Sequence, residues 1–250
     1  MIITNLSFRT PPKAGRRDPE SNTMDTRQEQ LLKMVVENHI ETAEPVGSKF
    51  LVNAKKLDWS EATVRNDLRA LEEEGYLSHP HTSAGRVPTE KGYKFFVDGL
   101  DLKNVKITKK DSAALGERNS DANDVEASGK QLAKAVAELA SATVIMAFSP
   151  NKVYYTGLSN LFNQPEFKDL NVVLDVSSMF DRCEECLEDF FDKANSDVSF
   201  FLGSEHPFGH LLSVASFKFG ENGLFSLLGP MRMDYKRNWA LVNETKKLIS

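Results

Sequence analysis

The chain has 250 residues, 40% hydrophobic and 27% charged, which is a globular composition and enough length for two cores. It has no apolar run long enough to span a membrane, and its N-terminus does not have the order of a secretory signal, so we expect a cytosolic protein. A net charge of −5 and only two cysteines exclude an overall basic protein and a disulfide framework.

The first predicted helix follows a stretch without an apolar period. Residues 1–23 are rich in proline and polar side chains, and two interpretations stay open: a disordered extension, or a mis-assigned start upstream of Met24. From Asp25 onward, apolar residues recur at helical spacing and predict a helix that ends near Thr42, before the Glu44–Pro45 pair.

Two more helices, a strand and a loop are predicted next. A second helix follows Pro45 and ends near Lys55, and Ser60 is a good N-cap for a third. Gly75 is the expected residue just beyond the end of that third helix. The remaining expectations for this region are a strand at 76–78, a loop at 80–88 and a helix from Thr89 that buries Tyr93, Phe95, Phe96 and Val97.

The C-terminal half is predicted to mix helices and strands. Residues 101–130 are polar and predict a linker with at most a poorly formed helix. Beyond it we expect helices at 131–142 and 235–249, and strands at 143–148, 153–156, 198–202, 212–219 and 224–228, the last two joined by a turn at 220–223. Residues 170–190 begin like a strand, but one apolar face continues at helical spacing, which favours a helix.

The order helix, helix, turn, helix, strand, loop is typical of a winged helix-turn-helix, in which the helix after the turn enters the major groove. The predicted outer side of that helix carries groups that suit base edges and phosphates: Ser60, Thr63, Arg65, Asn66 and Arg69. Ser48 and Lys49, at the start of the second helix, are candidates for binding a backbone phosphate.

The predicted loop supplies the remaining candidates. Its small residues would let a hairpin tip approach a nucleic-acid backbone closely. The candidate DNA-binding residues are His81, Thr82, Ser83 and Arg86, and Arg86 is expected to enter a minor groove.

The charge balance of residues 24–100 argues against this interpretation. The segment has 10 Lys and Arg against 13 Asp and Glu. Affinity for DNA comes largely from neutralised phosphates, and winged helices also bind proteins. The residues alone therefore leave two functions open, a DNA-binding module and a protein-binding module.

Long motifs resemble the heat-inducible transcription repressors of the HrcA family. They are EPVGSKFL (44–51), ATVRNDLRALEEEGYL (62–77) and PHTSAGRVPTEKGYKFFVD (80–98). The match is looser in YYTGLSNLFNQPEF (154–167), FFLGSEHP (200–207) and LLGPMRMDY (227–235), which follow the family's order along the chain.

The resemblance implies a bacterial, cytoplasmic, dimeric repressor of chaperone genes. It would bind an inverted-repeat operator of double-stranded DNA, release it under heat stress, and depend on a GroEL-type chaperonin. The implied fold class is α+β: an N-terminal winged helix-turn-helix domain at 24–100, the linker at 101–130, and a GAF-like α+β domain at 131–250. Family members are longer between about Phe148 and Val153, so this C-terminal domain is expected to lack the usual inserted subdomain, which puts the mode of dimerisation in question.

Other candidate sites are weaker. Cys183 and Cys186 form a single C-x-x-C without further ligands near in sequence, so a thiol pair within a helix is favoured over a metal or redox site. The acidic run Asp175, Asp181, Glu184, Glu185, Glu188, Asp189 and Asp192 is interpreted as a solvated helix face. No catalytic motif occurs, so we expect no enzyme, no cofactor and no metal.

Overall fold

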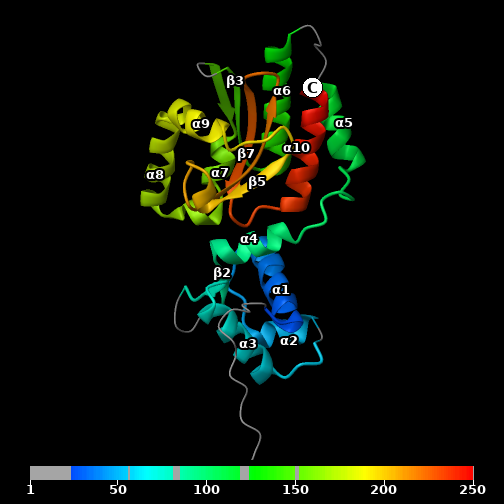
Figure 1. Ribbon diagram of the computed structural model, residues 1–250, viewed down its shortest axis with the longest axis vertical. Helices are drawn as coiled ribbons and strands as arrows, with labels where there is room; N and C mark the ends of the chain where they lie inside the picture. Colours follow the sequence, from blue (N-terminus) through cyan, green and yellow to red (C-terminus); the bar gives the residue numbers. More distant parts are fainter. Residues whose placement is uncertain (1–23, 56, 81–84, 119–123, 150–151, 250) are drawn as a thin grey trace, which may run out of the picture.

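Capping side chains begin the helices of the N-terminal part. The structure, a computed structural model, describes residues 24–55, 57–80, 85–118, 124–149 and 152–249 (Figure 1). Asp25 caps the first helix by accepting the Gln28 N–H at 2.8 Å. The elements of this part are α1 (Thr26–Thr42), α2 (Ser48–Lys55), α3 (Glu61–Glu73), β1 (Leu77–Ser78), β2 (Val87–Pro88) and α4 (Glu90–Asp98).

These elements confirm most of the predicted boundaries. Ser60 caps α3, Thr89 caps α4, and Gly75 follows α3 with a φ of +79°, as expected of a residue that ends a helix. β1 and β2 pair in antiparallel fashion. Tyr93, Phe96 and Val97 are buried as predicted, whereas Phe95 is half-buried. The alternative interpretations of residues 1–23 lie outside the described residues.

The C-terminal part is a sheet between two layers of helices. Its elements are α5 (Lys109–Arg118), α6 (Val125–Ala140), β3 (Thr143–Ser149), β4 (Lys152–Thr156), α7 (Leu158–Phe162), η1 (Pro165–Lys168), α8 (Leu170–Asp181), α9 (Cys183–Phe191), β5 (Ser199–Leu202), η2 (Gly203–Glu205), β6 (Leu212–Phe219), β7 (Gly223–Pro230) and α10 (Tyr235–Ile249). The five strands lie in the order β4-β3-β7-β6-β5, and all neighbours are antiparallel.

Successive side chains of a strand point to opposite faces of the sheet and so belong to two separate cores. Ile145 and Ala147 of β3 join the core under α7, α8 and α9, whereas Val144 and Met146 join the core under α5, α6 and α10 (Figure 1). Both faces of the sheet are therefore covered, which explains the apolar runs in its central strands. The predicted strands and the turn at 220–223 are confirmed.

Two segments differ in detail from the predictions. The predicted linker contains α5 and the first turns of α6, and Leu115 of α5 is fully buried against the neighbouring helices. With so few buried residues, the apolar pattern of α5 is too weak to predict a helix. Residues 170–190 are helical, as favoured, but they form two helices with a break at Arg182.

The two parts of the molecule share one core where α4 meets the sheet. Tyr235 is 1% exposed, and its ring lies 5.1 Å from that of Phe200 and 6.4 Å from that of Tyr93, centroid to centroid. The Glu90 carboxylate accepts the backbone N–H of Ser204 at 3.0 Å. We call this region, centred on Tyr235, the junction. It fixes the N-terminal helices to the sheet (Figure 1).

Among the described residues, no helix is both long and apolar enough to cross a membrane.

Candidate nucleic-acid interface

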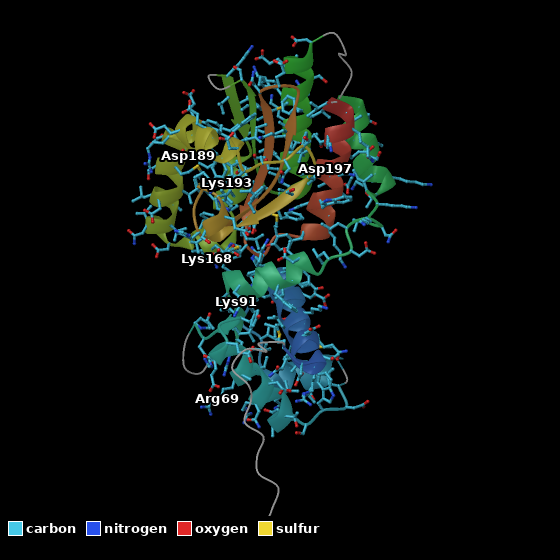
Figure 2. The ribbon with its side chains drawn as sticks, viewed as in Figure 1. Arg69, Lys91, Lys168, Asp189, Lys193 and Asp197 are labelled. Carbon is cyan, nitrogen blue, oxygen red and sulfur yellow. The ribbon has the colours of Figure 1, made fainter. Side chains whose placement is uncertain are left out.

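The outer face of α3 carries most of the predicted candidates. Arg65, Asn66 and Arg69 are exposed, while Val64, Leu68 and Leu71 on the other side of the helix are buried. Ser60 accepts the Thr63 N–H at 3.1 Å, so this serine serves as the cap that begins the helix. α3 lies at the end of the molecule away from the five-stranded sheet, and Figure 2 labels Arg69 there.

Exposed ion pairs hold the two arginines of this face. Arg65 Nη2 lies 2.6 Å from Glu61 Oε1, and Arg69 Nε lies 2.9 Å from Glu73 Oε1. Both pairs are separated by four residues on one helix, and the arginine side chains remain 67% and 74% exposed. Pairs of this kind contribute about 0.3–0.5 kcal/mol, so either guanidinium is free to exchange its partner for a stronger acceptor.

A bidentate ion pair fixes α3 to α1. Arg27 donates from Nε to Asp67 Oδ2 at 2.6 Å and from Nη2 to Oδ1 at 3.1 Å. Hydrogen bonding to Asp67 raises the pKa of Arg27 above its ordinary value. Asp67 is a buried charged residue of α3, so this contact sets the rotation of the helix and the direction of its outer face.

The start of α2 meets α3 and the residues just before β2 at a cleft of about 300 Å³. Three predicted residues, Ser48, Arg65 and Arg86, line it together with Gly47 and Gly85. A Cβ at Gly85 would come within 2.4 Å of the Val46 backbone, so the close approach of the chain before β2 to Val46 requires glycine. Lys49 is exposed beside the cleft.

Arg86 lies immediately before β2, on the loop side of the β1–β2 pair. Its backbone N–H and C=O both pair with Val46 at 2.8 Å. Its side chain is 16% exposed, with Nε 2.9 Å from Glu72 Oε2. The other oxygen of Glu72 contacts His79 Nδ1. Its entry into a minor groove stays a prediction, and His81, Thr82 and Ser83 lie outside the described residues.

Glu72 is the residue of this region that the sequence analysis missed. Its carboxylate connects α3 to His79, just after β1, and to Arg86, just before β2. In the sequence it belongs to the run Glu72–Glu74, which counted only as unfavourable negative charge. Its position seven residues before a histidine was the available signal, but the pattern is not specific.

The remaining candidates are placed as follows. Cys183 is buried and Cys186 half-buried in α9, both as free thiols, and burial raises the pKa of Cys183 to about 12. Such a thiol is protonated at neutral pH and unreactive. Within the described residues, no group of His, Cys, Asp or Glu is arranged to hold a metal ion.

Comparison with known proteins agrees with the motifs. Residues 99–238, more than half of the chain, match the family described as HrcA protein C terminal domain. The heat-inducible transcription repressor HrcA of Thermobifida fusca is 43% identical over 129 residues, which are 52% of this chain and 37% of that protein. Its counterpart in Cutibacterium acnes is 56% identical over 77 residues, 31% of this chain and 23% of that protein.

The matched part is well under half of the length of these two relatives. A crystal structure described only as that of a hypothetical protein has a TM-score of 0.77 at 18% identity. The superposition covers 91% of this chain and 98% of the other. At that identity it shows a shared fold, which extends over both parts of the molecule.

Proposed function

The chain belongs to the HrcA family, and on that premise we propose that it is a transcriptional repressor of heat-shock genes. It binds an inverted-repeat operator as a dimer and releases it under heat stress. One observation carries the proposal: α3 exposes Arg65, Asn66 and Arg69 at the end of the molecule farthest from the sheet.

In this proposal, residues 24–100 form a winged helix-turn-helix and the sheet part is GAF-like. The order of α1, α2 and α3 followed by the paired strands β1 and β2 supports the first assignment. An antiparallel sheet with helices on both faces supports the second. Ser149 of β3 pairs directly with Lys152 of β4, in agreement with a domain that lacks an inserted subdomain here.

The proposed mechanism divides the contacts between bases and phosphates. α3 enters the major groove, where Arg65 suits guanine and Asn66 suits adenine. Ser48 and Lys49 at the start of α2 bind a backbone phosphate, since amide groups at a helix N-terminus attract anions. Arg65 and Arg69 leave Glu61 and Glu73 on binding, at little cost because those ion pairs are exposed.

The dimer follows from the inverted repeat. Two copies related by a twofold axis present two α3 helices to half-sites about one helical turn, or a multiple of it, apart. The dependence on a GroEL-type chaperonin, which the family resemblance implies, is part of the proposal and rests on the resemblance alone.

A DNA titration tests the proposal. The full chain is titrated against an inverted-repeat duplex and a scrambled duplex of the same composition, at two salt concentrations, by fluorescence anisotropy. We expect tighter binding to the inverted repeat, weakened by salt in proportion to the phosphates contacted. Equal affinity for both duplexes would contradict sequence-specific repression.

A protein-binding adaptor is the second candidate, and the acidic excess of residues 24–100 favours it. In that case the exposed arginines of α3 contact acidic side chains of a partner protein. Absence of any binding to either duplex at low salt would favour the adaptor.

A further inference from the structure

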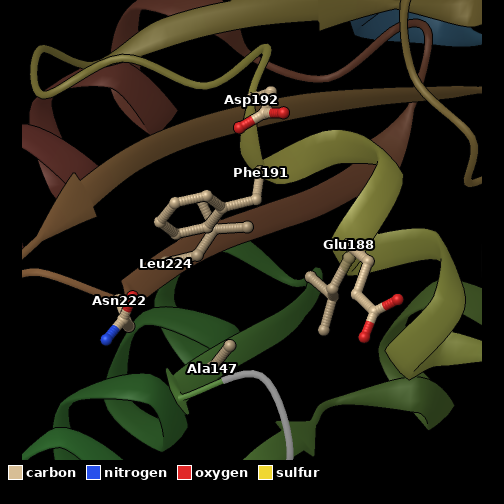
Figure 3. A pocket seen from close by; sticks show the side chains of 7 residues that line it. Ala147, Glu188, Phe191, Asp192, Asn222 and Leu224 are labelled. Atoms are coloured by element: carbon tan, nitrogen blue, oxygen red, sulfur yellow. The ribbon is translucent and has the colours of Figure 1, made fainter.

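A cavity of about 210 Å³ lies between α9 and the sheet, next to the turn that joins β6 and β7 (Figure 3). Protein interiors are close-packed, and voids much larger than a water molecule are few. An engineered apolar cavity of about 150 Å³ is large enough to bind benzene. This cavity therefore has room for a small ring or a short alkyl chain.

The inner wall of the cavity is apolar and rigid. Leu224 of β7 is 0% exposed, and Leu187 of α9 and Ala147 of β3 are each 5% exposed, so the wall belongs to the core under α9. The ring of Phe191 forms one side (Figure 3). Lys218 Nζ lies 4.2 Å from the centroid of that ring, so the chain's own lysine already occupies one face of the ring.

The rim of the cavity is polar and negative. Glu188 and Asp192, separated by four residues at the end of α9, and Asn222 in the β6–β7 turn line it (Figure 3). Over the described ranges, neither carboxylate forms an ion pair and the Asn222 amide has no hydrogen-bond partner. An acidic helix face alone is usually solvated, but here two carboxylates flank an opening into the apolar core.

We propose that this cavity binds a small amphipathic primary amine. The apolar part of the ligand packs against Leu187, Leu224 and Phe191, and its ammonium group lies at the rim, where the negative charges of Glu188 and Asp192 attract it. An anionic ligand of the same shape is repelled by the two carboxylates. The inference is independent of the proposed DNA-binding function, because it involves only the sheet part of the molecule.

Calorimetric titration of the full chain with 2-phenylethylamine tests the proposal, with 2-phenylethanol as the neutral analogue. The amine is protonated at pH 7, and we expect it to bind about tenfold more tightly than the alcohol, since a hydrogen bond to a charged group contributes more than a neutral one. No saturable binding of the amine, or equal affinities for the two compounds, would overturn the proposal.

Two double variants locate the site. Glu188→Gln combined with Asp192→Asn should weaken amine binding about tenfold and leave alcohol binding unchanged. Glu184→Gln combined with Glu185→Gln makes the same change of charge at exposed positions of α9 that do not line the cavity, and it should leave amine binding unchanged. If both double variants weaken amine binding equally, the amine binds the acidic surface in general and the proposed cavity site is wrong.

Discussion

Arg65 and Arg69 on α3 form ion pairs yet remain 67% and 74% exposed, whereas Tyr235 at the junction is 1% exposed. The first region holds its polar groups loosely in water, and the second packs aromatic rings from both parts of the molecule. Substitutions on α3 should therefore change binding and spare stability, and substitutions at the junction should do the reverse.

The largest effect is expected at the junction. Tyr235→Ala removes a fully buried ring that packs against Tyr93, Phe96 and Phe200, and should lower the free energy of unfolding by about 3–5 kcal/mol. Tyr235→Phe keeps the ring and loses only the hydroxyl group, which donates to the Met231 carbonyl at 2.5 Å, at a cost of about 1 kcal/mol. Urea denaturation measures both. Equal losses would mean that the hydroxyl group, and not aromatic packing, stabilises the junction.

A pH effect is expected beside the junction. Burial lowers the pKa of His206 to about 4, while the Leu212 carbonyl and Glu205 oppose this shift more weakly. The His206 imidazole is protonated near pH 6.5 in the unfolded chain, but only near pH 4 in the folded chain. The free energy of unfolding is therefore highest above pH 6.5 and decreases below it, by about 2 kcal/mol at pH 5.

Urea denaturation at pH 7.5 and 5 measures this loss. His206→Gln should reduce the loss between the two pH values, whereas His210→Gln, at an exposed position nearby, should retain it. A wild-type loss that persists unchanged in His206→Gln would assign the pH effect to other groups.

On α3, the effect should appear in binding. Arg65→Ala and Asn66→Ala should each weaken binding to the correct inverted repeat by about 1–3 kcal/mol and relax specificity. Arg86→Ala should weaken binding more evenly across sequences, and it also removes the contact with Glu72. Anisotropy titrations on specific and scrambled duplexes separate the two patterns, and unfolding curves that match the wild type would establish that Arg65→Ala is folded.

The smallest effect is expected for Glu73→Gln. It breaks the exposed pair with Arg69 and should change the free energy of unfolding by less than about 0.5 kcal/mol. It also removes a negative charge from the proposed DNA-binding face, so affinity for both duplexes should rise slightly at low salt. A large loss of stability would show that the ion pairs of α3 are structural.

The sequence predicted elements wherever capping or strong periodicity was present. Ser60 and Gly75 define α3, and the continuous apolar run from Val144 to Ala147 reflects the two buried faces of β3. It did not reveal α5, whose few buried residues give no clear period. The junction was also hidden, because Tyr93 and Tyr235 are separated by most of the chain and meet only through tertiary packing.

The sequence predicted only part of the candidate interface, because some of its contacts also depend on tertiary packing. Exposed residues such as Arg65 and Asn66 follow from the periodicity of one helix. The contacts of Glu72 with His79 and Arg86 depend on how the hairpin folds back onto α3, which local sequence does not specify.

The ratio of affinities for an inverted-repeat and a scrambled duplex, compared between the wild type and Arg65→Ala, tests the central claim most directly. We predict that the wild type prefers the inverted repeat and that Arg65→Ala loses most of this preference while keeping its weaker, salt-dependent binding to scrambled DNA. An equal loss of affinity on both duplexes would contradict the assignment of α3 as the helix that reads the operator.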